Sequence, residues 1–353
     1  MANKRDTLKR LWAESFGDSA EYIDMYFDRV YNDSDALTLE IDGKTVSSLL
    51  LQRYVMKFHG QEVPTSYISG ASTRKQERGK GYMSALIIDS LIESRRRGDM
   101  FCALIPAQPH LYFFYDRFGF ATTVYYDYQR YTSVHHFPYE GSYAEADNHF
   151  SPDIYEAFHN FEIQQKCGII HSQRDFLNIL DDLSLDNGKF IAMSNPSDGA
   201  VSGMGFAFEG DGYISIRCLL HENENARSAV LEHIRNAWPD RPICVMANPD
   251  KQPCNLHARG MFRIIDAGEC LRTIAAANPQ WKCAIKVTDP ILTDNNHIYI
   301  IANGRSDTND SYRGKLDFDV NADILTRLIF SSQSIGEITG FPSCRPTLRL
   351  MLD

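Results

Sequence analysis

The chain has 353 residues, of which 43% are apolar and 23% are charged, and its formal net charge is −10. This length exceeds what one hydrophobic core usually organises, so we expect two or three domains. The acidic balance disfavours nucleic acid as a principal partner. No run approaches the ~20 apolar residues of a membrane helix, so no membrane partner is expected.

The start of the chain and the cysteines predict the compartment. The first sixteen residues are polar and lack the apolar stretch of a secretory signal. Of the eight cysteines, the closest two, Cys244 and Cys254, are ten residues apart, which argues against a paired-cysteine metal or redox site. The histidines show no metal-ligand spacing either. We therefore expect reduced thiols, no metal and a cytoplasmic protein.

Apolar periodicity outlines the first 131 residues. A helical stripe from residue 5 to about 32, broken at Gly17-Asp18, predicts two helices. Strands are expected at 37–41, 45–54, 55–58 and 66–73, with a turn at Asp42-Gly43. A long helix then ends at Gly98. A buried strand at 100–105, a helix at 110–118 with Gly119 as its cap, and a strand at 120–131 follow.

A glycine-rich loop, Gln76-Glu77-Arg78-Gly79-Lys80-Gly81, joins the strand at 66–73 to the long helix. Unpaired N–H groups and the helix dipole make such a loop suitable for a phosphate or diphosphate, although Gly-x-Gly is also typical of a plain tight turn. A P-loop is excluded because Gly81, not Ser or Thr, follows Lys80. A dinucleotide fingerprint is excluded because Ser84 stands where its third glycine belongs.

Two motifs carry a family resemblance. Gln76-x-x-Gly79-x-Gly81 resembles the Q/R-x-x-G-x-G/A signature of the GCN5-related N-acetyltransferases (GNAT). Farther along, the run from Tyr115 to Phe120 resembles the Y-x-x-x-G-F element of the same family. The resemblance implies an acyltransferase that uses acetyl-CoA as the acetyl donor and holds the donor's diphosphate on the loop amides.

The resemblance also implies the donor-site residues and the acid. The positions that match cofactor contacts are Ser69, Gly70, Ala71, Glu77, Arg78, Gly79, Lys80, Gly81, Tyr82, Ala107 and Gln108. Tyr115 matches the general acid that protonates the departing thiolate. A tyrosine hydroxyl titrates near 10, so it can donate a proton at neutral pH. Tyr112, one helical turn earlier, is the alternative if the register shifts.

The second part of the chain repeats the order of the first after a polar linker at 135–153. Helices are expected at 154–165 and 174–183, strands at 189–195, 200–209 and 212–220, a helix at 226–237 and a strand at 242–247. At the loop equivalent to Gln76–Gly81, residues 220–227 contain no glycine but two acids, Glu222 and Glu224, which would repel a diphosphate. We expect a degenerate GNAT-like domain without a cofactor of its own.

The last ninety residues differ again. Asp266 is expected to cap a helix that runs to about residue 277. Strands are expected at 283–288, 297–302 and 315–320, with a polar loop at 303–313, and Asn321 is expected to cap a helix at 322–330. This segment resembles a sterol-carrier-protein-like domain. All three segments together resemble the Eis (enhanced intracellular survival) group of acetyltransferases, which also implies a homo-oligomer.

The predicted fold class is therefore α+β or α/β: tandem GNAT-like domains, the second degenerate, followed by a sterol-carrier-protein-like α+β domain. The predicted bounds are 1–135, 136–262 and 263–353. In the Eis group the C-terminal carboxylate reaches the active site, so Asp353 matches the base, through either its side chain or its terminal carboxylate.

An acidic stripe on the second helix, which contains Asp24 and Asp28, predicts a cationic acceptor, although such a stripe is also typical of a solvated helix face. The predicted function is direct acetyl transfer to a primary amine, either a small cationic molecule or an exposed lysine. The alternative is a non-catalytic protein that binds an apolar ligand in its C-terminal domain.

Overall fold

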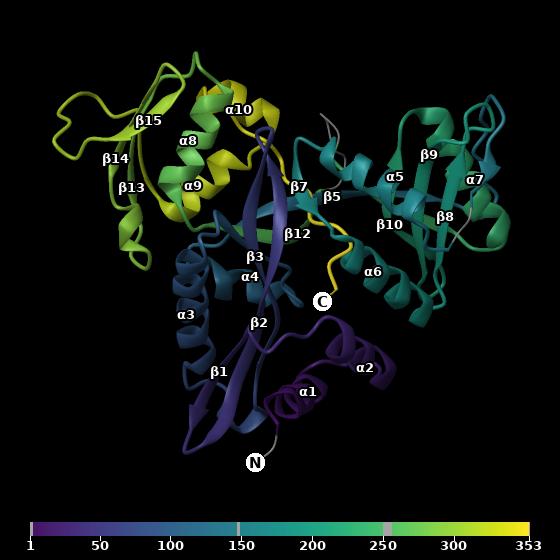
Figure 1. Cartoon of the computed structure of the whole chain (residues 1–353), viewed down its shortest axis with the longest axis horizontal. Coiled ribbons are helices and arrows are strands. Elements are labelled where there is room, and N and C mark those ends of the chain that lie inside the picture. The colour runs from purple at the N-terminus through teal and green to yellow at the C-terminus, as the bar shows by residue number, and fades with distance from the viewer. Residues whose placement is uncertain (1–2, 147–148, 250–255, 353) are drawn as a thin grey trace.

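The computed structural model of the chain describes residues 3–146, 149–249 and 256–352. A large sheet runs through the molecule, and a smaller sheet lies at the upper left of Figure 1. None of the described helices has the length and apolar character needed to cross a membrane.

The helices are α1 (Lys4–Ser15), α2 (Ala20–Arg29), α3 (Tyr82–Arg97), α4 (Pro109–Asp116), α5 (Pro152–Ile163), α6 (Gln173–Leu185), α7 (Glu224–Ala237), α8 (Ala267–Ala277), α9 (Ala322–Ile329) and α10 (Gln333–Thr339). The strands are β1 (Ala36–Ile41), β2 (Lys44–Phe58), β3 (Gln61–Thr73), β4 (Phe101–Leu104), β5 (Ala121–Tyr131), β6 (Ala144–Glu145), β7 (Cys167–Ile170), β8 (Lys189–Ser194), β9 (Val201–Glu209), β10 (Ile214–His221), β11 (Ile243–Ala247), β12 (Leu256–Ile264), β13 (Cys283–Thr288), β14 (Ile298–Ala302), β15 (Arg305–Thr308) and β16 (Phe318–Asn321).

The described strands form a sheet of twelve and a sheet of four. The order of the larger sheet is β1-β2-β3-β4-β12-β5-β11-β10-β9-β8-β6, with β7 paired to β2 off this path. The antiparallel pair β5–β11 joins the first and second parts of the chain into one sheet. β12 lies between β4 and β5 and is antiparallel to both, so a strand from far along the chain completes the first part of the sheet.

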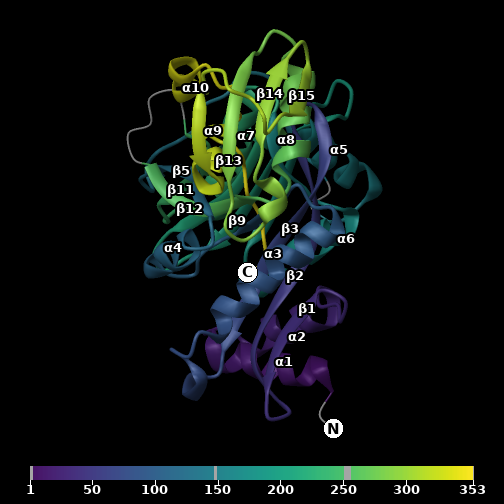
Figure 2. The same cartoon turned by 90° about the vertical axis from the view of Figure 1, so that its left-hand side faces the viewer.

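The first 131 residues follow the predicted order of elements, with two differences in the strands. β3 begins at Gln61, whereas the sequence predicted a strand at 66–73. The expected strands at 45–54 and 55–58 form a single strand, β2, which pairs with β1 over its first half and with β7 over its last residues. The predicted end of α3 is confirmed, because Gly98 is its C-cap and has φ 79°. α4 ends earlier than predicted, at Asp116 with Arg117 as its C-cap, and Gly119 follows two residues later with φ 81°. Seen from the side, α3 lies across β2 and β3, with the smaller sheet above it (Figure 2).

Five of the described helices and strands are absent from the sequence prediction: β6, β7, β12, β15 and α10. β15 falls in the segment expected to be a polar loop, where it forms the edge of the smaller sheet beside β14. Asp266 caps α8 as predicted, accepting a hydrogen bond from the Glu269 backbone N–H at 2.9 Å. Asn321 stands at the start of α9 as predicted, but its side chain makes no capping hydrogen bond.

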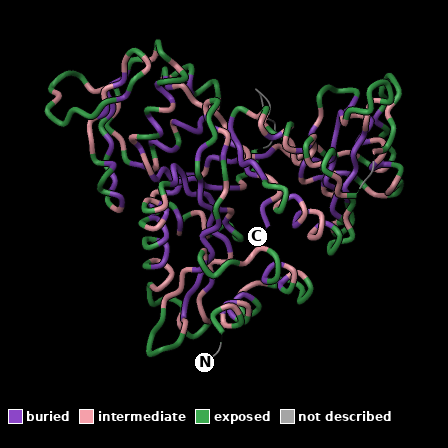
Figure 3. The backbone as a smooth tube through the Cα atoms, in the orientation of Figure 1, coloured by how far each residue is buried: buried purple, intermediate pink, exposed green. Residues whose placement is uncertain are grey.

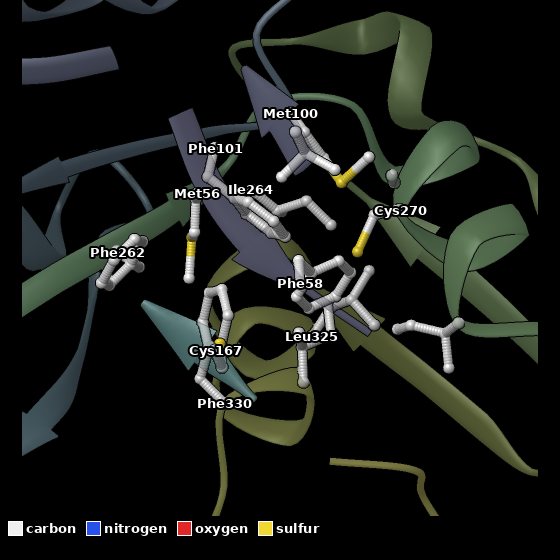
Figure 4. Close-up of a cluster of buried hydrophobic side chains, with 14 of the residues drawn as sticks. Met56, Phe58, Met100, Phe101, Cys167, Phe262, Ile264, Cys270, Leu325 and Phe330 are labelled. Carbon is white, nitrogen blue, oxygen red and sulfur yellow. The ribbon is translucent and has the colours of Figure 1, made fainter. Parts of the chain in front are cut away.

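One hydrophobic core joins all three parts of the chain. Buried positions continue from the strands of the large sheet to the helices that cover the smaller one (Figure 3). Figure 4 shows side chains from β2, β4, β7, β12, α8 and α9 in contact around this core, among them Met56, Phe58, Phe101, Cys167, Phe262, Ile264, Cys270, Leu325 and Phe330. Large buried side chains of this kind each contribute about 1.5–3 kcal/mol. The C-terminal part is therefore held firmly against the first sheet.

A buried ion pair ties the same parts together. Arg263 on β12 and Asp289, just after β13, are 1% and 0% exposed and lie 2.7 Å apart. Arg263 also donates hydrogen bonds to the carbonyls of Phe118 and Ile264, at 2.9 and 2.6 Å. A side chain at Gly119 would place its Cβ 2.7 Å from the Arg263 Nε, so only glycine leaves room for this contact.

Candidate active site

An open strand edge lies next to the glycine loop. β3 pairs with β4 only at residues 65–67, but β3 itself continues to Thr73. Beyond residue 67, no described strand pairs with this edge of β3, so its backbone N–H and C=O groups are free to pair with an extended ligand. Of the predicted pantetheine-binding residues, Ser69, Gly70 and Ala71 lie on this open segment.

The close packing of α1 explains two of these residues. Gly70 has φ 59°, and a Cβ at this position would lie 2.3 Å from the Trp12 ring. Glycine is therefore required both by the backbone conformation and by the contact with α1. The Ser69 hydroxyl forms a 2.6 Å hydrogen bond with the Tyr26 hydroxyl on α2, so only the backbone of Ser69 faces the open edge.

The glycine loop presents unpaired donors at the start of α3. Gly79 and Gly81 have φ 78° and 84°, and Gly81 stands immediately before the helix. The backbone N–H groups of residues 78–84 make none of the hydrogen bonds found between described residues. The helix dipole adds partial positive charge at the same point. Unpaired N–H groups at a helix start are the donors that an anion such as a diphosphate requires.

The charged side chains of the loop are partly engaged. The Lys80 Nζ lies 2.8 Å from Glu77, and this hydrogen bond raises the pKa of Lys80. The Arg78 Nε donates to the carbonyl of Thr73 at 3.1 Å. The loop therefore attracts an anion mainly through its backbone, with Arg78 at the wall of the adjoining cavity.

A cavity of about 710 Å³ lies over the loop and the end of β4. Eight of the eleven predicted cofactor residues line this cavity: Ala71, Glu77, Arg78, Gly79, Gly81, Tyr82, Ala107 and Gln108. The other three, Ser69, Gly70 and Lys80, do not line it. Sequence reasoning missed His110 and Arg117 on and beside α4, which also line the cavity. Arg117 lies next to Tyr115 and Phe118 in the second motif, which was the available signal.

Tyr115 faces this donor cavity from α4. Its side chain is 7% exposed, lines the cavity and makes no hydrogen bond to another described residue. Burial raises the pKa of Tyr115 to about 12, so its hydroxyl remains protonated throughout the neutral range. Tyr112 is not among the residues that line the donor cavity. The structure therefore offers Tyr115, rather than its neighbour one turn earlier, to a ligand in this space.

A second cavity, of about 360 Å³, adjoins the donor cavity. The α1–α2 connection contributes Ser15 and Phe16 to the donor cavity and residues 17–19 to the second one. After β4, Ile105 lines the second cavity and Ala107 lines the donor cavity. The α1–α2 connection and the residues after β4 thus form walls of both cavities, and a two-substrate transfer requires two such neighbouring spaces.

The C-terminal tail closes the second cavity. Residues 348–352 line it together with residues of α6, β10, β11 and β12. The tail runs through the middle of the molecule, between the first sheet and α6 (Figure 1). The Tyr126 hydroxyl on β5 holds it by donating a hydrogen bond to the carbonyl of Leu348 at 2.5 Å. Asp353, the predicted base, lies outside the described residues.

The two predicted acceptor residues lie elsewhere. Asp24 and Asp28 on α2 form ion pairs with Lys9 and Arg5 on α1, and their side chains are 61% and 64% exposed. Neither lines the donor cavity or the second cavity. The structure does not bring them together with Tyr115, and their acceptor role stays a prediction.

The corresponding loop in the second part of the chain, before α7, differs from the glycine loop before α3. Asn223 stands before α7, and its side chain accepts a hydrogen bond from the Ala226 N–H at 2.9 Å. The helix start is thus capped by the chain itself. With Glu222 and Glu224 beside the cap, the charge at this helix start is unfavourable for an anion. Among the described residues, no group of three or more metal-ligating side chains is arranged to hold a metal ion.

Comparisons with known proteins agree with this geometry. Residues 2–123 match the sequence model of the family described as Acetyltransferase (GNAT) domain. No curated protein matches the chain.

Several solved structures share the fold along nearly the whole chain. A GCN5-related N-acetyltransferase from Anabaena variabilis is 17% identical with a TM-score of 0.72, over 96% of this chain and 89% of that one. A probable N-acyltransferase from Enterococcus faecalis is 16% identical with a TM-score of 0.74, over 92% and 87%. Eis1 from Mycobacterium abscessus is 14% identical with a TM-score of 0.72, over 96% and 90%. The family match over residues 2–123 identifies the chain as an enzyme with a GNAT N-acetyltransferase domain.

Proposed function

We propose that the protein transfers the acetyl group of acetyl-CoA directly to a primary amine. The observation that carries this proposal is the set of unpaired backbone N–H groups at residues 78–84, which adjoin the same cavity as the Tyr115 side chain. In this arrangement the loop holds the diphosphate of the donor. The pantetheine arm pairs with the open edge of β3 and places the thioester near the end of β4.

The second cavity supplies the acceptor side of the reaction. The amine attacks the thioester carbonyl, the carbon–sulfur bond breaks, and Tyr115 gives its proton to the departing thiolate. The proton of the attacking amine needs a base, for which we propose the C-terminal carboxylate of Asp353. Its neighbour Leu352 lines the second cavity. Because a free terminal carboxyl titrates near 3.5, this base requires burial or a relaying water.

We further propose that the protein belongs to the Eis group and forms a homo-oligomer. The proposal also includes the three domain bounds given above and a last domain that is sterol-carrier-protein-like. The structural likeness to Eis1 supports membership of the Eis group at the level of the fold. The separate four-stranded sheet after residue 283 supports a distinct C-terminal unit.

A thiol-release assay tests the proposed reaction. Purified protein is mixed with acetyl-CoA and a panel of primary amines, and free CoA is measured together with the acetylated amine by mass spectrometry. Equal amounts of the two products are expected. Bound lipid in the purified protein, with no thiol release for any amine, would instead support the non-catalytic binding protein.

Substituting Gly81 tests the diphosphate loop. Gly81→Val forces a β-branched residue to φ 84°, which costs about 1–2 kcal/mol and moves the loop amides. We expect the dissociation constant for acetyl-CoA to rise at least about tenfold, as measured by calorimetry. Gly43→Val is the matched control, because Gly43 has φ 71° in the β1–β2 hairpin, away from the cavity. It should lose comparable stability and keep its affinity; equal loss of affinity in both variants would refute the role of the loop.

A further inference from the structure

We propose that the acceptor amine also carries an oxyanion, a carboxylate or a phosphate, which Arg259 and Arg349 bind in the second cavity. This inference rests on the proposed function and specifies the class of acceptor. Both arginines line the 360 Å³ cavity, and neither forms an ion pair with a described residue. Two arginines that make no ion pair with a described residue therefore line one cavity, in a chain with a net charge of −10.

Arg259 reaches the cavity from an irregular part of β12. The pairing register with β5 shifts on both sides of Gly260, so that residue 259 is left without a partner between Ala258 and Gly260. Such bulges redirect a side chain out of the regular alternation. Burial raises the pKa values of Tyr112 and Tyr126, and the Arg259 guanidinium opposes both shifts, which places its charge between α4 and β5.

Arg349 reaches the cavity from the C-terminal tail. Its Nε atom is buried and has no hydrogen-bond partner among the described residues. A buried charged donor without an acceptor is more unfavourable than a neutral one, so a bound anion would be favoured here. Arg349 lies near the buried Cys218 thiol, and burial raises the pKa of that thiol to about 11. The thiol is therefore neutral and supplies no counter-charge.

The other charged residues that line the second cavity are three aspartates and Arg217. Arg217 lies 3.7 Å from Asp186, and Asp18 accepts a hydrogen bond from the Trp12 indole N–H at 2.6 Å. Asp182 lies on α6 and Asp186 is the C-cap of that helix, whereas Arg259 and Arg349 come from β12 and the tail. The cavity thus has an acidic side and a basic side. A molecule with both an amine and an acid group matches this distribution, and a polyamine does not.

The size of the second cavity and the position of Arg259 restrict the class of acceptor further. A space of 360 Å³ is at the lower end of ligand-binding cavities, which run from about 300 to 1,000 Å³. Arg259 is two residues from Met261, which pairs with Leu104, the last residue of β4. The next residue, Ile105, lines the second cavity, and Ala107 lines the donor cavity. The bound oxyanion would therefore lie close to the reacting amine. Amino acids and short amino phosphates have this spacing.

Matched pairs of amines test the proposal. Lysine is compared with cadaverine, and phosphoethanolamine with ethanolamine, by measuring kcat/KM from thiol release. We expect the anion-bearing member of at least one pair to be preferred by about tenfold or more. The pair that shows the preference distinguishes carboxylate from phosphate. Equal or greater activity with the members that lack an anion, or no turnover of any of the four, would overturn the inference.

Substitution of each arginine tests whether it causes the preference for the anion-bearing amine. Arg259→Gln and Arg349→Gln should each lower kcat/KM for the anion-bearing amine and leave the other member of the pair much less affected, so that the ratio falls toward one. Arg345→Gln is the control, because Arg345 lies on the same tail but does not line this cavity. A ratio that stays unchanged in both cavity variants would contradict the assignment.

Calorimetry with acetyl-CoA alone distinguishes failure of the proposed function from failure of the inference about the acceptor. If acetyl-CoA does not bind, the proposed function fails and this inference fails with it. If acetyl-CoA binds and the amines that lack an anion are preferred, only the inference about the acceptor fails.

Discussion

Replacing Tyr115 with phenylalanine is expected to lower kcat for acetyl transfer by about 100-fold or more, because general-acid catalysis contributes about 10²–10⁴-fold. The variant loses only the hydroxyl that faces the donor cavity. The ring remains packed between Phe114 and Phe120, at centroid distances of 5.1 and 5.9 Å. We therefore expect the dissociation constant for acetyl-CoA to change by less than about twofold.

Steady-state thiol release and calorimetry measure the two quantities. Tyr112→Phe is the control: this tyrosine lies one turn earlier and does not line the donor cavity, so kcat should stay near that of the parent protein. Because burial raises the pKa of Tyr115 to about 12, the parent should keep its general acid up to about pH 10. Unchanged kcat in Tyr115→Phe, or a large loss in Tyr112→Phe alone, would move the acid to another group.

Breaking the Arg263–Asp289 pair is expected to produce the largest loss of stability. Asp289→Ala leaves the guanidinium of Arg263 buried without its counter-charge, which typically costs about 3–5 kcal/mol. It also removes the acceptor for the backbone N–H groups of Ile291 and Leu292, at 3.1 and 3.0 Å. The free energy of unfolding, measured by denaturant titration followed by circular dichroism, should fall by this amount.

The exposed pair between Arg327 and Asp116 provides the control. It also connects the C-terminal part to α4, at 3.1 Å, but its side chains are 42% and 52% exposed. Asp116→Ala should therefore cost no more than about 1 kcal/mol. A similar loss in the two variants would show that burial does not govern the strength of this connection.

The buried pair of Arg263 and Asp289 also predicts how the stability of the protein depends on pH. Burial raises the pKa of Asp289, but Arg263 and the hydrogen bonds from Asn295 and the backbone outweigh burial and lower it overall. A carboxyl with a lowered folded-state pKa contributes its full stability above the unfolded-state pKa of about 3.9, and loses it as the pH falls through the folded-state value. Acid unfolding below about pH 4 should thus be less steep in Asp289→Ala than in the parent protein.

The sequence predicted the elements whose signal is local. α3 and its closing Gly98, the turn at Asp42-Gly43 and the cap at Asp266 depend on periodicity and on glycine or capping residues within a few positions. β12 was missed because its sequence, Leu256–Ile264, has no clear alternation and it is stabilised by pairing with β4 and β5, more than 120 residues earlier. β15 was missed because an edge strand tolerates a polar sequence.

The same distinction holds for the site. The glycine loop and Tyr115 could be proposed as site residues from the sequence, because each lies in a short motif, and in the structure both line one cavity. Arg259 and Arg349 could not, because neither stands in a motif; they meet only through the insertion of β12 and the course of the tail. The acidic stripe on α2 could also be seen in the sequence, but the ion pairs of Asp24 and Asp28 with α1 depend on how the two helices pack.

Calorimetric titration of acetyl-CoA into the full chain tests the central claim most directly. The loop at residues 78–84 offers unpaired amides, whereas the start of α7 is capped by Asn223. The titration should therefore give one acetyl-CoA per chain, with binding weakened at least about tenfold in Gly81→Val and unchanged in Gly43→Val. Absence of binding, a stoichiometry of two, or binding insensitive to Gly81→Val would contradict the assignment of the donor site.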